Sequence, residues 1–125
     1  MLLVEEQKKI ASLINAIIDI PLVSEEMEQI IFEHAVAIID AALDDILPEV
    51  FAGLLHDPGK GIDKDHARDF AMRLAVAVNK RVNLPYLNEE QEGRMIQTVI
   101  DPIVKAMIDG RRLQDVLPAY AQAQS

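Results

Sequence analysis

The spacing of apolar positions along the chain predicts four long helices. In residues 4–18 apolar side chains recur every three or four positions, as on one face of a helix. A second helix, from Ser24 to about Ile46, is apolar around most of its circumference. Its narrow polar stripe consists of Glu26, Gln29, Glu33, Asp40 and Asp44. Helices over residues 66–82 and 88–109 follow, and no segment alternates with the period of two that a strand requires. The pattern therefore predicts an all-α fold.

A proline break precedes each of the two longest helices. Pro21 and Pro85 stop the helix before them, because the residue preceding a proline is disfavoured in the α region. Ser24 and Asn88 then occupy the expected N-cap positions, each followed by glutamates in the positive first turn. Pro102 lies inside the last long helix and predicts a kink there.

The same pattern occurs twice, 64 residues apart. Residues 15–43 align with residues 79–107 without a gap, and seven of the 29 pairs are identical. The identical pairs are Asn15/Asn79, Pro21/Pro85, Glu25/Glu89, Glu26/Glu90, Glu28/Glu92, Ile39/Ile103 and Ala42/Ala106. A chance alignment of this length would give about two identities, so the match indicates an internal duplication.

The duplication predicts the architecture. Two sequence-related helix–corner–helix units, about 4–47 and 66–110, pack as a four-helix bundle and are joined by a Gly/Pro loop at 56–65. Short additional helices are expected at 48–55 and 111–120. We expect residues 1–125 to form one helical domain, because this length is enough to bury a core.

Composition narrows the function classes. Half of the residues are apolar and only five are aromatic, so the core must be largely aliphatic. With no cysteine, disulfides, thiolate catalysis and cysteine-based metal sites are excluded. The net charge of −9 repels phosphate backbones, which argues against nucleic-acid partners. The chain has neither a signal-peptide pattern nor the run of about 20 apolar residues that a membrane span needs, so we expect a cytoplasmic protein.

The string Leu54-Leu55-His56-Asp57-Pro58-Gly59-Lys60 is the one local motif that could carry chemistry. It resembles the HD-domain metal-dependent phosphohydrolases, which are all-helical and place His-Asp at a helix end before Gly-Lys. The resemblance implies a divalent metal held by His56 and Asp57, with His34 as the earlier histidine and Asp109 or Asp101 as the later aspartate. Such a metal would lower the pKa of a bound water and orient a phosphoester.

Each of these residues also has a structural interpretation. His34 lies among Ile30, Ile31 and Ile38, where a single histidine is usually a packed side chain. The pair His56 and Asp57 can simply end a helix before proline and glycine.

The excess of apolar surface on residues 24–47 and 88–109 favours a function in association. A monomer of this size does not readily bury helices that are apolar on several faces. The sequence therefore predicts a non-enzymatic helical interaction or oligomerisation module, an adaptor or regulator without a cofactor. Its partner would be a second copy of the chain, giving a homo-oligomer, or another helical protein. The alternative is the metal-dependent phosphohydrolase.

Overall fold

The structure of the protein is a computed structural model that describes residues 2–47 and 64–124. Within these residues all regular structure is helical, which confirms the all-α prediction. The helices are α1 (Val4–Ile17), α2 (Glu25–Ile46), α4 (Lys64–Arg81), α5 (Glu89–Asp109) and α6 (Leu113–Gln124). The short helix predicted at 48–55 and most of the loop predicted at 56–65 lie outside the described residues. Lys64 and Asp65, which the sequence pattern assigns to that loop, already belong to α4.

The two long helices begin and end as their sequences require. At the start of α2 the Ser24 hydroxyl accepts a hydrogen bond from the Met27 N–H at 3.2 Å. Asn88 and Gln91 form a reciprocal capping box at the start of α5, with distances of 2.8 and 3.1 Å. At its other end α5 stops at Gly110, whose φ of 62° is accessible to glycine at little cost.

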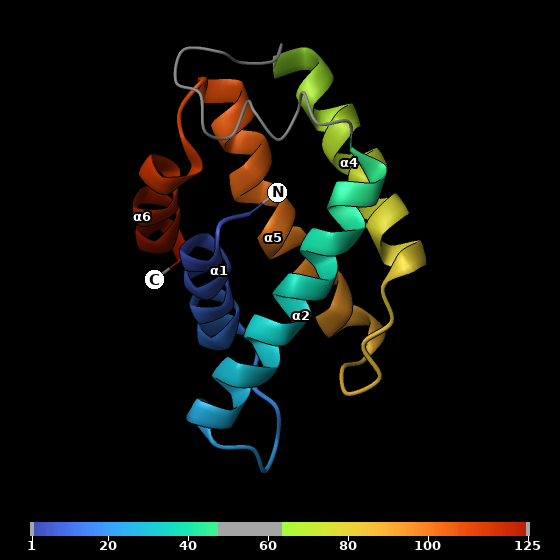
Figure 1. The fold of residues 1–125 in the computed structure, drawn as a ribbon, viewed down its shortest axis with the longest axis vertical. Helices are drawn as coiled ribbons and strands as arrows, with labels where there is room; N and C mark the ends of the chain where they lie inside the picture. The colour runs from blue at the N-terminus through green and yellow to red at the C-terminus, as the bar shows by residue number, and fades with distance from the viewer. Residues whose placement is uncertain (1, 48–63, 125) are drawn as a thin grey trace.

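The helices pack in sequential pairs (Figure 1). α1 lies against α2, and α4 lies against α5. Contacts between α2 and α4 and between α1 and α5 join the two pairs, and α6 covers α5 and α1. Each helix pair is therefore formed by neighbours in the chain, while the contacts between pairs bring the two halves of the sequence together.

One cluster of buried side chains includes residues from all five helices. Its largest fully buried members are Phe32, Ile10, Ile14, Ile39, Leu43, Leu84, Met95, Ile96, Ile100, Ile103 and Met107. Phe32 is the one aromatic ring among them, so the core is aliphatic as the composition predicts. None of the helices in the described part of the chain is long and apolar enough to cross a membrane.

Asp40 is buried, which corrects its assignment to the polar stripe of α2. Its carboxylate lies between α2 and the start of the chain, where it accepts hydrogen bonds from the Leu2 N–H at 2.9 Å and from Gln7 Nε2 at 3.3 Å. Burial raises the pKa of Asp40 above its ordinary value of 3.8, while the Leu2 hydrogen bond opposes that rise. Helical periodicity misplaces this residue because Leu2, before α1, and Gln7, in the first turns of α1, supply hydrogen-bond donors to it.

The two proline corners are closed by the same backbone hydrogen bonds. After the first helix the Val23 N–H donates to the Ile20 carbonyl at 3.3 Å. At the equivalent positions 64 residues later, the Leu87 N–H donates to the Leu84 carbonyl at 3.0 Å. In both corners the proline lies inside the turn that these bonds close. The chain therefore reverses direction at Pro21 and at Pro85 by a similar local device.

The corners differ at the residue that follows the proline. Leu22 has a φ of 68°, and its side chain is fully exposed. Tyr86, at the equivalent position, does not have a positive φ. A left-handed backbone conformation costs an L-residue about 1–2 kcal/mol, and the position after proline in such a turn normally favours glycine. The first corner therefore holds a strained leucine that makes little contact with the core.

We expect Leu22→Gly to raise the free energy of unfolding by about 0.5–1 kcal/mol. Glycine removes the strain of the positive φ, and this gain exceeds the extra entropy of glycine in the unfolded chain. Urea denaturation followed by circular dichroism measures the change. The control is Tyr86→Gly, which should give no gain because there is no strain to remove. A Leu22→Gly protein no more stable than the parent would contradict the expectation.

Candidate functional site

One face of α2 carries exposed apolar and small side chains. This face, called the α2 stripe below, consists of Met27, Ile30, His34, Ala37, Ile38 and Ala41. The spacing of three and four residues places all six on one side of the helix. Met27 is 51% exposed, Ile30 61% and Ile38 38%. At 1.5 Å per residue the stripe extends about 21 Å along α2, which crosses the front of the molecule in Figure 1.

The opposite face of α2 belongs to the core. Phe32, Val36 and Ile39 are fully buried there, in the cluster to which α1 also contributes. α2 therefore has two apolar faces, one packed and one exposed. The sequence predicts the excess of apolar surface, because the helix is apolar around most of its circumference. Which face remains exposed depends on how α1 and α4 pack against it, which the helical period does not reveal.

All the charged side chains of α2 are acidic. The helix contains no lysine or arginine, and its seven carboxylates are Glu25, Glu26, Glu28, Glu33, Asp40, Asp44 and Asp45. Glu26, Glu33 and Asp44 are seven and then eleven residues apart, so they follow one edge of the α2 stripe. Asp45 pairs with Arg81 of α4 at 3.4 Å, with both side chains largely exposed, so this pair contributes little to stability.

A shallow groove adjoins the far end of the α2 stripe. It has a volume of about 340 Å³ and lies between α2 and the end of α4. Its lining residues are Ile38, Ala41, Ala42, Asp45, Arg81 and Val82. The two alanines leave room above the helix backbone, so a side chain from outside could enter beside Ile38.

A second pair of exposed apolar side chains lies on α4. Met72 is 69% exposed and Val76 is 56% exposed. Unlike the α2 stripe, this face carries charges of both signs, and Arg73 pairs with Asp69 at 3.1 Å. The face is short and mixed in charge, so it offers a natural control surface for experiments on α2.

The described residues of the predicted metal site, His34, Asp101 and Asp109, do not form one group of metal ligands. His34 is exposed within the α2 stripe, so it is not a packed core side chain. Asp109 pairs with Lys105 one helical turn away, at 3.5 Å. His56 and Asp57 lie outside the described residues. Within the described ranges no group of three His, Cys, Asp or Glu side chains could hold a metal ion.

Asp101, the other predicted aspartate, joins α5 to α6. Gln97, one turn earlier, donates a hydrogen bond to its carboxylate. The Tyr120 hydroxyl of α6 is also hydrogen-bonded to Asp101, and burial together with this carboxylate raises the pKa of Tyr120 to about 12. Asp101 therefore helps to attach the terminal helix.

A pair of carboxyl groups lies at the first corner. Glu28 is buried, and its carboxylate accepts a hydrogen bond from the Ile20 N–H. Burial raises the pKa of Glu28 above its ordinary value of 4.5, and the hydrogen bond and charge of Asp19 raise it further. At the second corner Glu92 accepts from the Leu84 N–H at 3.1 Å, and an asparagine takes the place of Asp19. The first corner thus holds two acids where the second holds an acid and an amide.

We expect Asp19→Asn to stabilise the protein at neutral pH and to have little effect near pH 4. Because folding raises the pKa of Glu28, the protonated form contributes stability below 4.5, and this contribution is lost as the pH rises through the raised pKa. An amide at position 19 can donate to ionised Glu28, which removes part of that loss.

The measurement for Asp19→Asn is the urea midpoint across this pH range. Glu90→Gln serves as the control, because it removes an exposed acid far from the first corner. If the urea midpoints of the parent and of Asp19→Asn changed with pH in parallel, the acid pair of Asp19 and Glu28 would not be the cause of the pH dependence.

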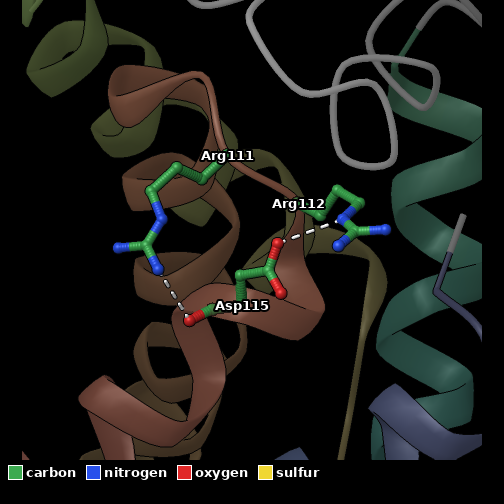
Figure 2. Close-up of polar contacts among 3 residues, drawn as sticks. All are labelled: Arg111, Arg112 and Asp115. Carbon is green, nitrogen blue, oxygen red and sulfur yellow. Dashed lines mark hydrogen bonds and ion pairs between the residues drawn. The ribbon is translucent and has the colours of Figure 1, made fainter.

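The two arginines before α6, Arg111 and Arg112, both form hydrogen bonds with Asp115 in the first turn of α6 (Figure 2). Arg112 Nε lies 3.0 Å from an Asp115 carboxylate oxygen, and Arg111 donates to the Asp115 carbonyl at 3.2 Å. Figure 2 shows the two guanidinium groups on opposite sides of Asp115. The three residues stabilise the turn between α5 and α6, and the two arginines do not form one joint cationic patch.

Comparison with known proteins gives no match for this chain. No protein-family model matches it, and neither does any curated protein or solved structure.

Proposed function

We propose that the chain is a non-enzymatic helical interaction module, an adaptor or regulator that associates with a helix through the α2 stripe. The observation that supports this proposal is the exposure of Met27, Ile30 and Ile38 on one face of a helix. Three large apolar side chains in one row are typical of surfaces that become covered on association. Helix-in-groove recognition uses such anchors at intervals of three, four and seven residues.

We also infer that the two halves arose by duplication. Seven identical pairs in a gap-free alignment of 29 positions support the inference. So do the matching N-caps at Ser24 and Asn88, and the carboxylates of Glu28 and Glu92, which accept backbone N–H groups at equivalent places. The duplication makes the two long helices, α2 and α5, counterparts of each other.

The phosphohydrolase alternative draws no support from the described residues. Of its ligand set, His34 lies on the open face of α2 and Asp109 pairs with a lysine. His56 and Asp57 lie outside the described part of the chain. The interaction module is therefore the function we propose.

The test combines self-association with peptide binding. Sedimentation equilibrium measures association of the chain with itself, and fluorescence anisotropy measures binding to labelled amphipathic helical peptides of positive, neutral and negative charge. We expect association with at least one of them, weakened about tenfold or more by Ile30→Ser, because an isoleucine buried on binding contributes about 1.5–3 kcal/mol.

Val76→Ser on α4 is the matched control for Ile30→Ser, because both residues are exposed aliphatic side chains on a helix. It should leave association unchanged. A chain that stays monomeric and binds none of the peptides would contradict the proposed function.

A further inference from the structure

We propose that the occupant of the α2 stripe is a cationic amphipathic helix from another protein. This inference rests on the proposed function and names the chemistry of its partner: one apolar face, with lysine or arginine along its edges.

Helix α5, the counterpart of α2, indicates the shape of the occupant. His34, Ala37 and Ile38 correspond to Thr98, Asp101 and Pro102 on α5, 64 residues later. Those three positions are not open: Thr98 and Pro102 are buried, Asp101 is half-buried, and Tyr120 of α6 is hydrogen-bonded to Asp101. At Asp101, the counterpart of Ala37, a helix of this chain therefore reaches part of the face that α2 leaves exposed.

α6 also shows what kind of helix suits such a face. Among the α6 side chains that the structure describes, the buried ones are Leu113, Val116 and Leu117, a spacing of three and four residues that forms one apolar face. It contacts both α5 and α1. An amphipathic helix of similar construction fits the α2 stripe, whose length of about 21 Å corresponds to about four helical turns. One of its side chains could enter the groove beside Ile38 and Ala41.

The charge of the occupant is indicated by the edge of the stripe. Glu26 and Glu33 follow that edge, and α2 itself contains no lysine or arginine. Lysine or arginine on the partner would meet these carboxylates at the rim of the interface. There, complementary charge mainly sets specificity and the rate of association.

The same charges argue against a second copy as the occupant. Pairing two α2 stripes would bring the edge carboxylates of one helix, Glu26 and Glu33 among them, towards those of the other, and α2 contains no lysine or arginine. Like charges placed opposite each other disfavour such a pairing. The net charge of −9 adds to the repulsion between copies.

The experiment uses three designed helical peptides with the same leucine face. Their flanking positions carry lysine, glutamine or glutamate, and the full-length chain is titrated with each. We expect the lysine peptide to bind about tenfold or more tightly than the glutamine peptide, and its affinity to fall as salt is added. The Ile30→Ser and Ile38→Ser variants should each weaken its binding about tenfold, because they remove apolar anchors.

Two double variants test whether the carboxylates along the edge of the α2 stripe contribute to binding. Glu26→Gln combined with Glu33→Gln removes two carboxylates beside the stripe. Glu89→Gln combined with Glu90→Gln removes two exposed carboxylates at the start of α5, one of which corresponds to Glu26 in the duplication. We expect the first pair to weaken binding of the lysine peptide about threefold to tenfold and the second to change it less than twofold.

The outcomes separate this inference from the proposed function. Equal binding of lysine and glutamine peptides, still sensitive to Ile30→Ser, overturns the cationic partner and leaves the interaction module standing. Self-association that Ile30→Ser abolishes has the same meaning: it overturns the cationic partner and leaves the interaction module standing. Binding of the lysine peptide that Ile30→Ser leaves unchanged is attraction by net charge alone and overturns the inference. Failure of every peptide and of self-association overturns both proposals.

Discussion

Phe32→Ala should lower the free energy of unfolding by about 3–5 kcal/mol, the largest effect we expect from one substitution. Phe32 is fully buried and is the one aromatic ring among the largest buried side chains of the core. Truncation removes its transfer free energy and leaves a cavity that the surrounding helices fill only in part. A domain is typically stable by about 5–15 kcal/mol, so the variant would lose a substantial part of its stability.

Urea denaturation followed by circular dichroism measures the loss for Phe32→Ala. Met72→Ala is the control, because its side chain is exposed on α4 and its removal should change stability by less than about 0.5 kcal/mol. Similar midpoints for the two variants would mean that Phe32 is not packed as the structure describes.

Ile39→Ala and Ile103→Ala should each cost about 2–5 kcal/mol and should shift the same unfolding transition. The two isoleucines are paired in the gap-free alignment of residues 15–43 with 79–107, and both are fully buried. Residues from both halves of the chain belong to one buried cluster, so removing either side chain weakens a shared core. Unfolding should therefore stay two-state in each variant.

The measurement for this pair compares far-ultraviolet circular dichroism with tyrosine fluorescence during urea denaturation. Coincident curves are expected for the parent and for both variants. Two separate transitions, with each substitution moving only one of them, would show that the halves unfold independently and would contradict a shared core.

Most of the fold could be predicted from local sequence signals. The helix limits follow from residues whose effects act within a few positions: Ser24 and Asn88 as caps, Pro21 as a stop and Gly110 as an end. The aliphatic core follows from composition. These signals are reliable because the hydrogen bonds of a helix and its caps connect residues close together in the chain.

The surface of the site could be predicted only in part. The sequence indicates that α2 has more apolar surface than a small monomer buries, and the α2 stripe is that excess. It does not indicate that Asp40 is buried, because Leu2 and Gln7 meet this residue from a distant part of the chain. His34 illustrates the same limit. Its isoleucine neighbours suggest a packed side chain, yet Ile30 and Ile38 are themselves exposed beside it.

Placement of α6 on α5 also has a consequence for valency. In a symmetric dimer of identical hairpins every surface must occur twice. Two hairpins tethered in one chain are released from that requirement, and here a terminal helix contacts α5 while the α2 stripe stays open. Within the described residues the molecule offers one copy of this surface, so the proposed association predicts one partner helix per chain.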